Sequence, residues 1–326
     1  MNTTMNAIIY TQYGSPDVLQ FKEVEKPTPK DNEVLIKVYA SSLNAADSHY
    51  MRGTPWLFRL ACGIQKPRNI RFGGDVAGRV EAVGKNITQF RLGDEVFGDL
   101  SGFGRGALAE YVCAPEEALV LKPANISFEE AAAMPVASVT ALGGLRNKGQ
   151  IQAGQRVLIN GASGGVGSFA VQIAKSFGAE VTAVCSTSKM DMVRSLGADH
   201  VIDYTKEDFT RNGQRYDFIL AANGYHPMLA YQRALSPEGT YVTTGGTMAQ
   251  YFESMLMGPL VSMRGQKRMG NWTTKPNQAD LTYVRDLVQA GKVKPAIDRA
   301  YLLHETGDGM RHFEKGSARG KIVITV

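Results

Sequence analysis

A glycine-rich turn, with an apolar segment before it and a helical pattern after it, is the part of the chain whose residue types most directly indicate chemistry. It reads Gly161-Ala-Ser-Gly-Gly-Val-Gly167, between apolar residues 157–160 and a helical pattern at 169–177. Glycines in such a turn permit unusual backbone angles, let a phosphate approach the backbone, and bring the helix close to the sheet. The start of the helix directs free N–H groups and the positive end of its dipole at an anion.

The pyrophosphate of a dinucleotide is the anion that suits this turn. A flexible connecting loop is the alternative, but the strand before the glycines and the helix after them favour a nucleotide site. The candidate cofactor-binding residues of the turn are Ser163, Gly164, Gly165, Val166 and Gly167.

The end of the next predicted strand indicates which dinucleotide is bound. Residues 179–186 form that strand, and no acid stands at its tip, where NAD-binding proteins place a carboxylate for the ribose hydroxyl. Ser186 and Lys189 instead offer a hydroxyl and an ammonium group, which bind a 2′-phosphate by charge-assisted hydrogen bonds. The sequence therefore predicts NADPH rather than NADH. An ordinary solvated helix residue is the alternative interpretation of Lys189.

The composition is that of a soluble globular protein with a large core. The 326 residues suggest two domains, and the net charge of +5 is spread without a basic run, so nucleic-acid binding is not predicted. Three scattered cysteines are too few for a disulfide framework or a Cys-x-x-Cys metal site. The N-terminal segment lacks the pattern of a signal peptide, and no apolar stretch is long enough to span a bilayer. We expect no membrane insertion and a cytoplasmic location.

Two changes of pattern along the chain predict its domain organisation. The first part shows short alternating strands separated by Gly and Pro, at residues 34–39, 78–83, 95–98 and 109–113. After an alanine-rich helical segment at 128–145, strands and helices alternate, with strands expected at 157–160, 180–185, 200–203, 217–221 and 240–244. This alternation is typical of a doubly wound parallel sheet in an α/β protein.

The C-terminal part adds a helix at 279–290, the segment 295–303 and an apolar strand at 320–326. A strand this apolar needs a sheet to join, and the N-terminal β domain offers one. We therefore predict a discontinuous β domain, residues 1–124 and 276–326, with a nucleotide-binding domain, residues 125–275, inserted in it. A cleft between two such domains is a favoured ligand site.

Short motifs occur from one end of the chain to the other in a specific order. They are SLNAAD at 42–47, GGDVAG at 73–78 with VEAVG at 80–84, GDEVF at 93–97, GALAEYV at 106–112, NGASGGVG at 160–167, LGAD at 196–199 with VIDY at 201–204, and GKIVITV at 320–326. Each is weak alone, but in this order the chain resembles the medium-chain dehydrogenase/reductases, in their zinc-independent, quinone-oxidoreductase-like branch. The resemblance implies a GroES-like β domain that carries a Rossmann domain.

The departures from this family concern metal. Zinc-dependent relatives place a Cys where this chain has Ala45-Ala46, and a His-Glu pair where it has Gly74-Asp75. The four-cysteine structural lobe of those relatives is also missing, and the chain has too few cysteines to form it. His49 is near the first position, but a lone His is more often a polar surface group or a substrate contact than a ligand. The sequence predicts no metal site.

Without a metal to polarise a carbonyl, the easier chemistry is hydride addition to an electron-poor acceptor such as an enone or a quinone. The resemblance places Asn44 and Asp47 at the nicotinamide end of the cleft. Tyr50 is our candidate proton donor to the oxygen of the reduced product, with simple packing as its alternative role. Residues 56–62 form an apolar run that is expected to be a substrate lid, a short packed helix, or both.

The resemblance also implies the remaining cofactor contacts. It places Thr140 at the nicotinamide and Tyr204 at the 2′-phosphate beside Ser186 and Lys189. Strand 240–244 is expected to end beside the nicotinamide, where Gly245 permits close approach. Asn223 stands where relatives often have a valine-glycine pair, and it either replaces that contact or only turns the loop.

Three alternatives to a quinone or enone reductase remain open from the sequence. Two are enzymes: a zinc-free alcohol dehydrogenase and an enoyl-thioester reductase. The third is an RNA-binding or regulatory member of the family, which the basic pI suggests but no interleaving of aromatic and basic residues supports. A homodimer that pairs along residues 239–244 is the assembly that the resemblance suggests.

Overall fold

The computed structural model describes residues 3–246, 248–263 and 266–326, and these form two compact units. The first unit comprises the described residues up to Val136 together with Lys275–Gln289 and Pro295–Val326, and the second comprises Ala137–Thr274 and Ala290–Lys294. No described helix is both long and apolar enough to cross a lipid bilayer.

The first unit contains two sheets, whose strand pairs are antiparallel apart from one parallel pair at the edge of the larger sheet. β1 (Thr4–Ile9) pairs with β2 (Gln20–Glu25), and a larger sheet has the order β14 (Ile297–Leu302), β15 (Lys321–Thr325), β3 (Glu33–Ser42), β4 (Asp75–Val83), β5 (Glu95–Asp99), β7 (Leu119–Leu121). β6 (Tyr111–Pro115) also pairs with β3. It begins two residues later than its sequence pattern predicts, because Ala109 instead forms a bridge with Ala7.

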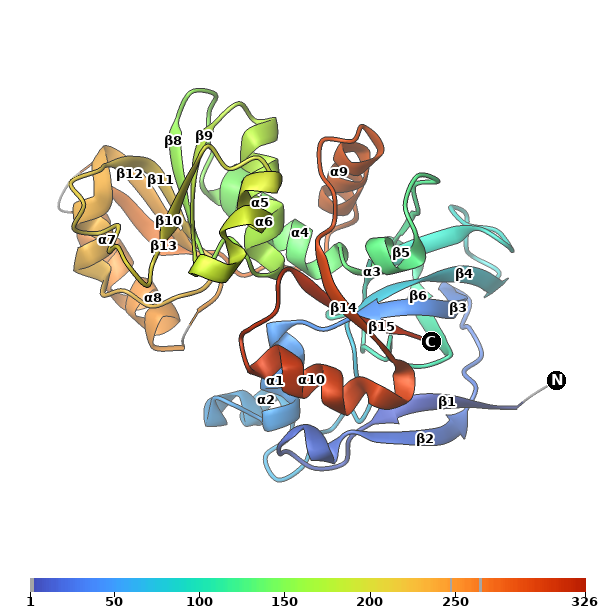
Figure 1. Ribbon diagram of the computed structural model, residues 1–326. Coiled ribbons are helices and arrows are strands. Elements are labelled where there is room, and N and C mark those ends of the chain that lie inside the picture. Colours follow the sequence, from blue (N-terminus) through green and yellow to red (C-terminus); the bar gives the residue numbers. More distant parts are fainter. Residues whose placement is uncertain (1–2, 247, 264–265) are drawn as a thin grey trace. The chain divides into compact units, whose positions relative to one another are not determined.

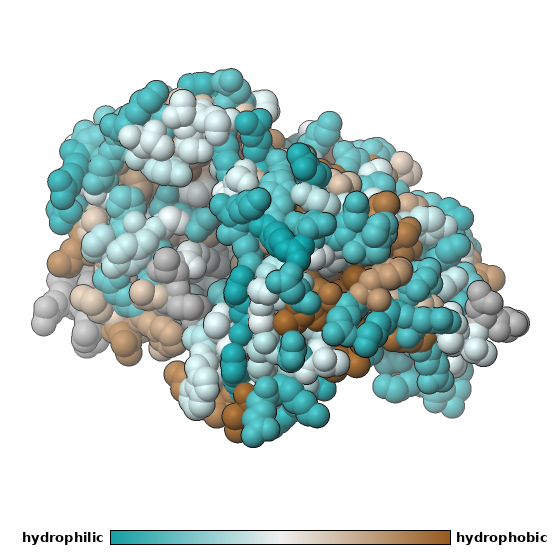
Figure 2. Space-filling model, turned by 60° about the horizontal axis from the view of Figure 1, so that its bottom comes forward, coloured by the Kyte–Doolittle hydropathy of each residue, from teal (hydrophilic) through white to brown (hydrophobic). Residues whose placement is uncertain are grey.

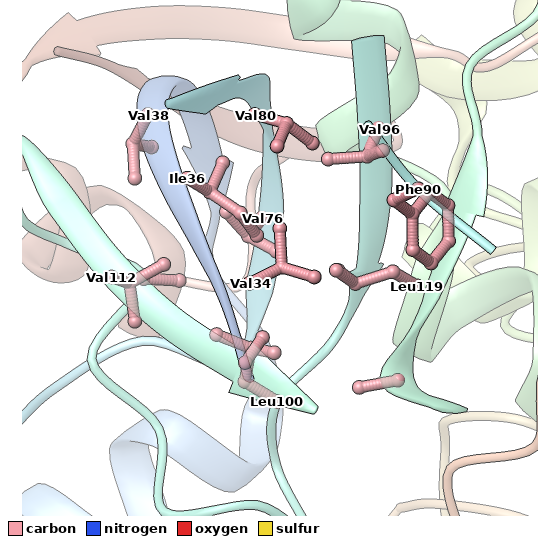
Figure 3. Packing of buried hydrophobic residues seen from close by; sticks show 13 residues of the cluster. Val34, Ile36, Val38, Val76, Val80, Phe90, Val96, Leu100, Val112 and Leu119 are labelled. Atoms are coloured by element: carbon pink, nitrogen blue, oxygen red, sulfur yellow. The ribbon is translucent and has the colours of Figure 1, made fainter. Parts of the chain in front are cut away.

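Alternating β-branched residues explain this sheet. Val34, Ile36 and Val38 of β3 point to one face and are at most 3% exposed. Figure 3 shows them packed with Val76 and other apolar side chains of β4, β5 and β7 in one cluster. Valine and isoleucine favour strands because their branched side chains pack well on a pleated surface, so this cluster specifies the register of the sheet.

The C-terminal strand joins the larger sheet of the first unit between β14 and β3, as its apolar sequence predicts. β15 runs antiparallel to β3, with Val323 opposite Ser42, and Figure 1 shows these two segments from opposite ends of the chain side by side. The pairing places Lys321, at the start of β15, level with the residues that follow β3. The helices of this unit are α1 (Ala45–Arg52), α2 (Arg59–Cys62), α3 (Phe128–Ala132), α9 (Gln278–Gln289) and α10 (Thr306–Glu314).

The helix expected at 128–145 is divided into three pieces. α3 is followed by α4 (Pro135–Leu142) and by a π-helical turn, Gly143–Lys148. Pro135 lacks an N–H and disfavours helical geometry at the residue before it, which explains the break. Residues 125–136 consequently belong to the first unit, where Phe128 stacks on Tyr39 of β3 with ring centroids 4.5 Å apart.

The second unit is a doubly wound sheet of six parallel strands. Their order is β10 (His200–Asp203), β9 (Glu180–Cys185), β8 (Arg156–Asn160), β11 (Tyr216–Ala221), β12 (Leu235–Thr243), β13 (Arg268–Asn271). Counted along the chain this is the order 3-2-1-4-5-6 of dinucleotide-binding folds. Helices α5 (Gly165–Ser176) and α6 (Met190–Ser195) lie on one face, and α7 (Met228–Ala234) and α8 (Met248–Met263) on the other (Figure 1). The predicted fold class, a β domain with an inserted Rossmann domain, is confirmed.

The edge of this sheet differs from the expectation. The short segment Arg268–Asn271 has no strand pattern in the sequence, yet it pairs with β12 as β13. β12 is therefore an interior strand, flanked by β11 and β13. Residues 239–244 cannot pair with a second copy of the chain along a free strand edge, so that predicted mode of dimerisation is wrong.

Figure 2 shows a largely hydrophilic surface on which hydrophobic side chains form separate patches. One group of exposed apolar residues lies in the predicted lid of the first unit. Trp56 and Leu57 form a 3-10 turn before α2, and each is about 60% exposed. The segment is helical, as one of the two expectations stated, but none of its residues is buried, so the expected packing is wrong. Its role as a lid stays a prediction.

Candidate functional site

The glycine turn of the second unit has the geometry that its sequence predicts. Gly161 follows β8 with φ +81°, and Gly164 precedes the first helical residue of α5. A Cβ atom on Gly167 would lie 2.1 Å from the carbonyl oxygen of Gly161, so no other residue fits there without moving the backbone. The first N–H groups of an α-helix lack intrahelical partners. The turn therefore fits a pyrophosphate, and the buried Ser163 lies within it.

The carboxyl ends of the parallel strands bring several other candidate residues to one edge of the sheet. The register pairs Asn160 with Val184, Asp203 with Cys185, and Ala221 with both Asn160 and Thr243, so these strands end at the same level. The candidate residues that directly follow these ends are Ser186, Tyr204, Asn223 and Gly245. Lys189 closes the 3-10 turn after Ser186, and Tyr204 is 61% exposed.

Asn223 and Gly245 lie against neighbouring backbone at this edge. The N–H of Asn223 donates to the Asn160 carbonyl at 3.2 Å, and a Cβ on Gly161 would lie 2.7 Å from the Cβ of Asn223. Gly224, with φ +89°, makes Asn223 part of a turn as well. A Cβ on Gly245 would lie 2.4 Å from a carbonyl oxygen, so the close approach there requires glycine. Thr140 is buried in α4.

The structure adds a carboxylate to this edge that the analysis of the sequence missed. Asp203, at the end of β10, accepts hydrogen bonds from the hydroxyl groups of Thr187 and Thr205 and from the N–H of Thr205 at 3.0 Å. These hydrogen bonds, with that from Thr187 the largest cause, lower the pKa of Asp203 to about 2. A negative charge thus faces the turn that carries Lys189, and Lys206 offsets it with Nζ 3.6 Å away.

A second polar cluster lies in the first unit and is centred on the buried carboxylate of Asp75. Its Oδ2 accepts from Ser42 Oγ at 2.6 Å, Asn44 Nδ2 at 2.7 Å and Lys321 Nζ at 3.2 Å. Its Oδ1 accepts from the N–H of Val136 at 2.9 Å. A buried charge is tolerated only when it is paired and hydrogen-bonded, and Asp75 meets both conditions.

Lys321 supplies the positive charge of this cluster. Its ammonium group is 2% exposed and donates to the Leu43 carbonyl at 3.0 Å, to Asn44 Oδ1 at 2.5 Å and to Asp75. All three N–H donors of an ammonium group are thereby used. Because Asn44 contacts both charges, its amide is held in one orientation at the start of α1.

The candidate catalytic residues follow one another along α1, with Asn44 as the N-cap residue before its first turn. Asn44, Asp47 and Tyr50 are spaced three residues apart, so they lie near one face of the helix. Asp47 is 1% exposed, and its Oδ2 accepts from the N–H of Asn44 at 2.9 Å. Burial raises the pKa of the Asp47 carboxyl, although the charge of Arg105 opposes that rise. Tyr50 packs edge-to-face on Phe58 with centroids 4.6 Å apart.

Comparisons with known proteins match two segments of the chain to families. Residues 30–124 match the alcohol dehydrogenase GroES-like domain, and residues 196–324 match the zinc-binding dehydrogenase family. The chain is 35% identical over 334 residues to a chloroplast envelope quinone oxidoreductase homolog of Arabidopsis thaliana, with 98% of each chain covered. It is 33% identical to a chloroplastic NADPH-dependent alkenal/one oxidoreductase of the same plant, covering 98% of this chain and 79% of the relative.

A solved structure gives the same result. The quinone oxidoreductase of Coxiella burnetii superposes with a TM-score of 0.87 at 29% identity, with 99% of each chain covered. The chain belongs to the quinone-oxidoreductase-like branch of the medium-chain dehydrogenase/reductase superfamily. The motifs that run the length of the sequence therefore indicated the family correctly.

The described part of this medium-chain dehydrogenase/reductase does not present the donor set that zinc needs. Among the described residues, no group of three or more His, Cys, Asp or Glu side chains comes together in a way that could hold a metal ion. Structural and catalytic zinc is held by imidazole, thiolate or carboxylate groups in sets of three or four. Here Gly74-Asp75 stands where zinc-dependent relatives have a His-Glu pair, and the Lys321 ammonium group lies against the Asp75 carboxylate. The residues present do not fit zinc.

Three polar residues that the site contains had no individual role assigned from the sequence. Ser42 and Lys321 hold Asp75, and Arg105 lies beside Asp47 with Nη1 4.0 Å from Oδ1. A lysine at the start of an otherwise apolar strand, and an arginine between glycines, were the available signals. Neither residue type indicates which side chain it will contact, because the contacts are long-range: Lys321 and Asn44 are 277 positions apart in the sequence.

Asp99 gives a prediction about pH and stability. Burial, then repulsion by Asp75, raises its pKa to about 6. Since an unfolded Asp titrates near pH 4, the folded state binds this proton more tightly, and stability falls as pH rises from about 4 to about 6. We expect Asp99→Asn to stabilise the protein at neutral pH by about 2 kcal/mol and to leave it unchanged below about pH 4. Urea unfolding from pH 3.5 to 8 checks this, and equal stabilisation at every pH would contradict it.

Proposed function

We propose that this protein is an NADPH-dependent, metal-independent reductase that transfers hydride to an electron-poor acceptor such as a quinone or an α,β-unsaturated carbonyl. The observation that carries the proposal is the replacement of a metal-ligand set by the Asp75–Lys321 pair in a family member that keeps the glycine turn. Without a Lewis acid, hydride addition to an already polarised acceptor is the easier reaction. The names of the two plant relatives, a quinone oxidoreductase homolog and an alkenal/one oxidoreductase, support this acceptor class.

The second unit is proposed to bind the cofactor, which supplies the hydride when bound. The turn from Ser163 to Gly167 binds the pyrophosphate through backbone N–H groups. Ser186, Lys189 and Tyr204 bind the 2′-phosphate, and Asp203 holds their turn in place through Thr187. The nicotinamide is assigned to Thr140, Asn223 and Gly245.

The first unit is proposed to act on the acceptor. Hydride forms a C–H bond at the electron-poor carbon, the π electrons move to the oxygen, and Tyr50 donates its phenolic proton to that oxygen. Water then restores the proton of Tyr50. Asn44 is held by Asp75 and Lys321, and Asp47 is held by the N–H of Asn44, so both present fixed polar groups. Fixed groups of this kind lower the cost of reorganisation during the reaction.

An acceptor screen tests the proposed function and its alternatives. The purified protein is incubated with NADPH and one acceptor from each of four classes: a quinone, an enone, an enal and an enoyl thioester, and separately with NADP⁺ and alcohols. We expect NADPH consumption with the first three classes and no change on adding a chelator. Turnover with alcohols alone, or salt-sensitive RNA binding without any turnover, would contradict the proposal.

A cytoplasmic location stays a prediction, since both plant relatives are named as chloroplast proteins.

Lys189 provides a test of cofactor choice. We expect Lys189→Gln to lower kcat/KM for NADPH by about 10- to 100-fold and to leave kcat/KM for NADH unchanged, because a charge-assisted hydrogen bond to the 2′-phosphate is lost. Arg194→Gln is the matched control, since Arg194 lies on the following helix and pairs with Asp191 at 3.0 Å. Equal losses with both cofactors in Lys189→Gln would show that Lys189 does not recognise the phosphate.

A further inference from the structure

Arg105 is a buried charged residue whose side chain lacks hydrogen-bond partners in the described protein. It is 5% exposed, and none of its Nε, Nη1 and Nη2 atoms has an acceptor among the described residues. A guanidinium group carries five N–H donors and stays protonated at any ordinary pH. Leaving such donors unpaired in the interior costs free energy. A buried arginine in this state indicates a ligand that brings the acceptor.

The neighbours of Arg105 leave its charge partly uncompensated. Its guanidinium carbon lies 3.1 Å from the centre of the Tyr50 ring, and Nη1 lies 4.0 Å from Asp47 Oδ1, beyond hydrogen-bond distance. The other oxygen of Asp47 is taken by the N–H of Asn44. Burial also disfavours the charged form of Asp47. Arg105 therefore keeps both donors and positive charge available, next to the proposed proton donor.

The loop around Arg105 fixes the position of this charge. Arg105 has φ +59°, between Gly104 at +93° and Gly106 at +110°. A left-handed conformation is uncommon for a residue with a side chain, and residues held this way concentrate at functional sites. The loop is nevertheless anchored on both sides: Arg105 N–H donates to the Leu100 carbonyl at 3.0 Å, and Asn69 Nδ2 donates to the Gly104 carbonyl at 2.5 Å.

We propose that Arg105 binds the carbonyl oxygen of the acceptor and, with Tyr50, forms the site that stabilises the oxyanion produced by hydride addition. This inference rests on the proposed function. NADPH is oxidised as its hydride forms the new C–H bond, and the π bond breaks so that its electron pair reaches the oxygen. The guanidinium N–H groups donate to that oxygen while it is negative. Tyr50 then transfers its proton to it, and water reprotonates Tyr50.

In this role Arg105 should affect the reduction of different acceptors to different extents. A simple enone gives an enolate, which is a strongly basic oxyanion. A quinone that takes the hydride at one carbonyl oxygen, with an O–H bond in place of the C–H bond, passes the electron pair to its other oxygen and gives a hydroquinone anion, which is stable without help. Donors aimed at the oxygen matter most where the charge is least stable by itself. Arg105 should therefore contribute far more to the reduction of enones than to that of quinones.

Binding of 4-nitrophenol tests the site without any turnover. At a pH below its own pKa this phenol is neutral in water, and its visible absorbance reports the phenolate. We expect the wild-type protein to bind it as phenolate, and Arg105→Met to bind the phenolate at least 10-fold more weakly. Arg156→Met is the control, because Arg156 also lies over a tyrosine ring, that of Tyr216 with the guanidinium carbon 5.7 Å from the centroid, but its Nη2 donates to Gln214 Oε1 at 2.7 Å. Unchanged phenolate binding in Arg105→Met would overturn the proposal.

Steady-state kinetics with cyclohexenone and benzoquinone give the second readout. We expect Arg105→Met to lower kcat about 100-fold for the enone and less than about 10-fold for the quinone. The kcat of Arg105→Lys should lie between that of Arg105→Met and that of the wild type. Equal losses for both acceptors, together with a lowered Tm, would assign Arg105 a purely structural role. If Arg105→Met does not fold, Arg105→Lys decides by the same two measurements. Phenolate binding by a wild-type protein that reduces neither acceptor would refute the proposed function and keep the oxyanion site.

Discussion

Replacing Lys321 by Met is expected to lower the free energy of unfolding of the first unit by about 3–5 kcal/mol, the largest stability effect we predict. The substitution keeps most of the side-chain volume but leaves the Asp75 carboxylate buried without its cation. It also removes the donor that Asn44 Oδ1 and the Leu43 carbonyl accept from. Urea unfolding measures the total loss in the free energy of unfolding, and hydrogen exchange of peptides from β3 and β15 shows where in the unit that stability is lost.

Two further variants separate the buried pair from ordinary surface charge. Lys85→Met removes a lysine that pairs with Asp31 at 2.8 Å but is 73% exposed, and it should change stability by less than about 1 kcal/mol. The double variant Asp75→Asn, Lys321→Met leaves neither charge alone, so it should be more stable than Lys321→Met. If the effects of Asp75→Asn and Lys321→Met on the free energy of unfolding are simply additive, the two side chains are not energetically coupled and the cluster does not act as an ion pair.

Replacing Gly167 by Ala is expected to reduce NADPH affinity by about 100-fold or more, because a displaced turn no longer aligns its N–H groups with the pyrophosphate. The new Cβ would lie 2.1 Å from the Gly161 oxygen and 2.7 Å from the Ala162 Cα, and neither backbone atom can rotate away. The same strain should cost about 1–3 kcal/mol of stability. Calorimetric titration with NADPH and thermal unfolding measure the two effects.

Gly164→Ala separates ligand contact from folding. Its Cβ would meet the Gly161 oxygen at 3.6 Å, an ordinary contact, and Gly164 has φ −84°, which alanine adopts freely. We expect the free protein to keep its Tm, while NADPH affinity falls about 10-fold as the methyl group crowds the phosphate and weakens a charge-assisted hydrogen bond. Tight NADPH binding by both variants would show that the pyrophosphate binds elsewhere.

Local patterns were sufficient to predict most of the fold. The strand, glycine turn and helix around Gly161 are contiguous, so residue spacing alone predicts their geometry. The strands at 180–185 and 200–203 were predicted with their observed bounds. β13 was missed because its four residues carry no apolar alternation, and only pairing with β12 makes Arg268–Asn271 a strand. Helix 128–145 was predicted as one element although Pro135 divides it.

Less of the candidate site than of the fold could be predicted from the sequence. The sequence by itself determined the family, the fold class and the glycine turn, since these depend on neighbouring residues or on motifs that act as a set. Tertiary structure alone decided that Lys321 neutralises Asp75, that Asp203 faces the turn of Lys189, and that Arg105 lies on Tyr50. Each of these contacts joins residues that are far apart in the chain or in separate elements. The attraction between two opposite charges becomes strong only where folding has removed the water around both. In such a place a buried charge also needs its partner.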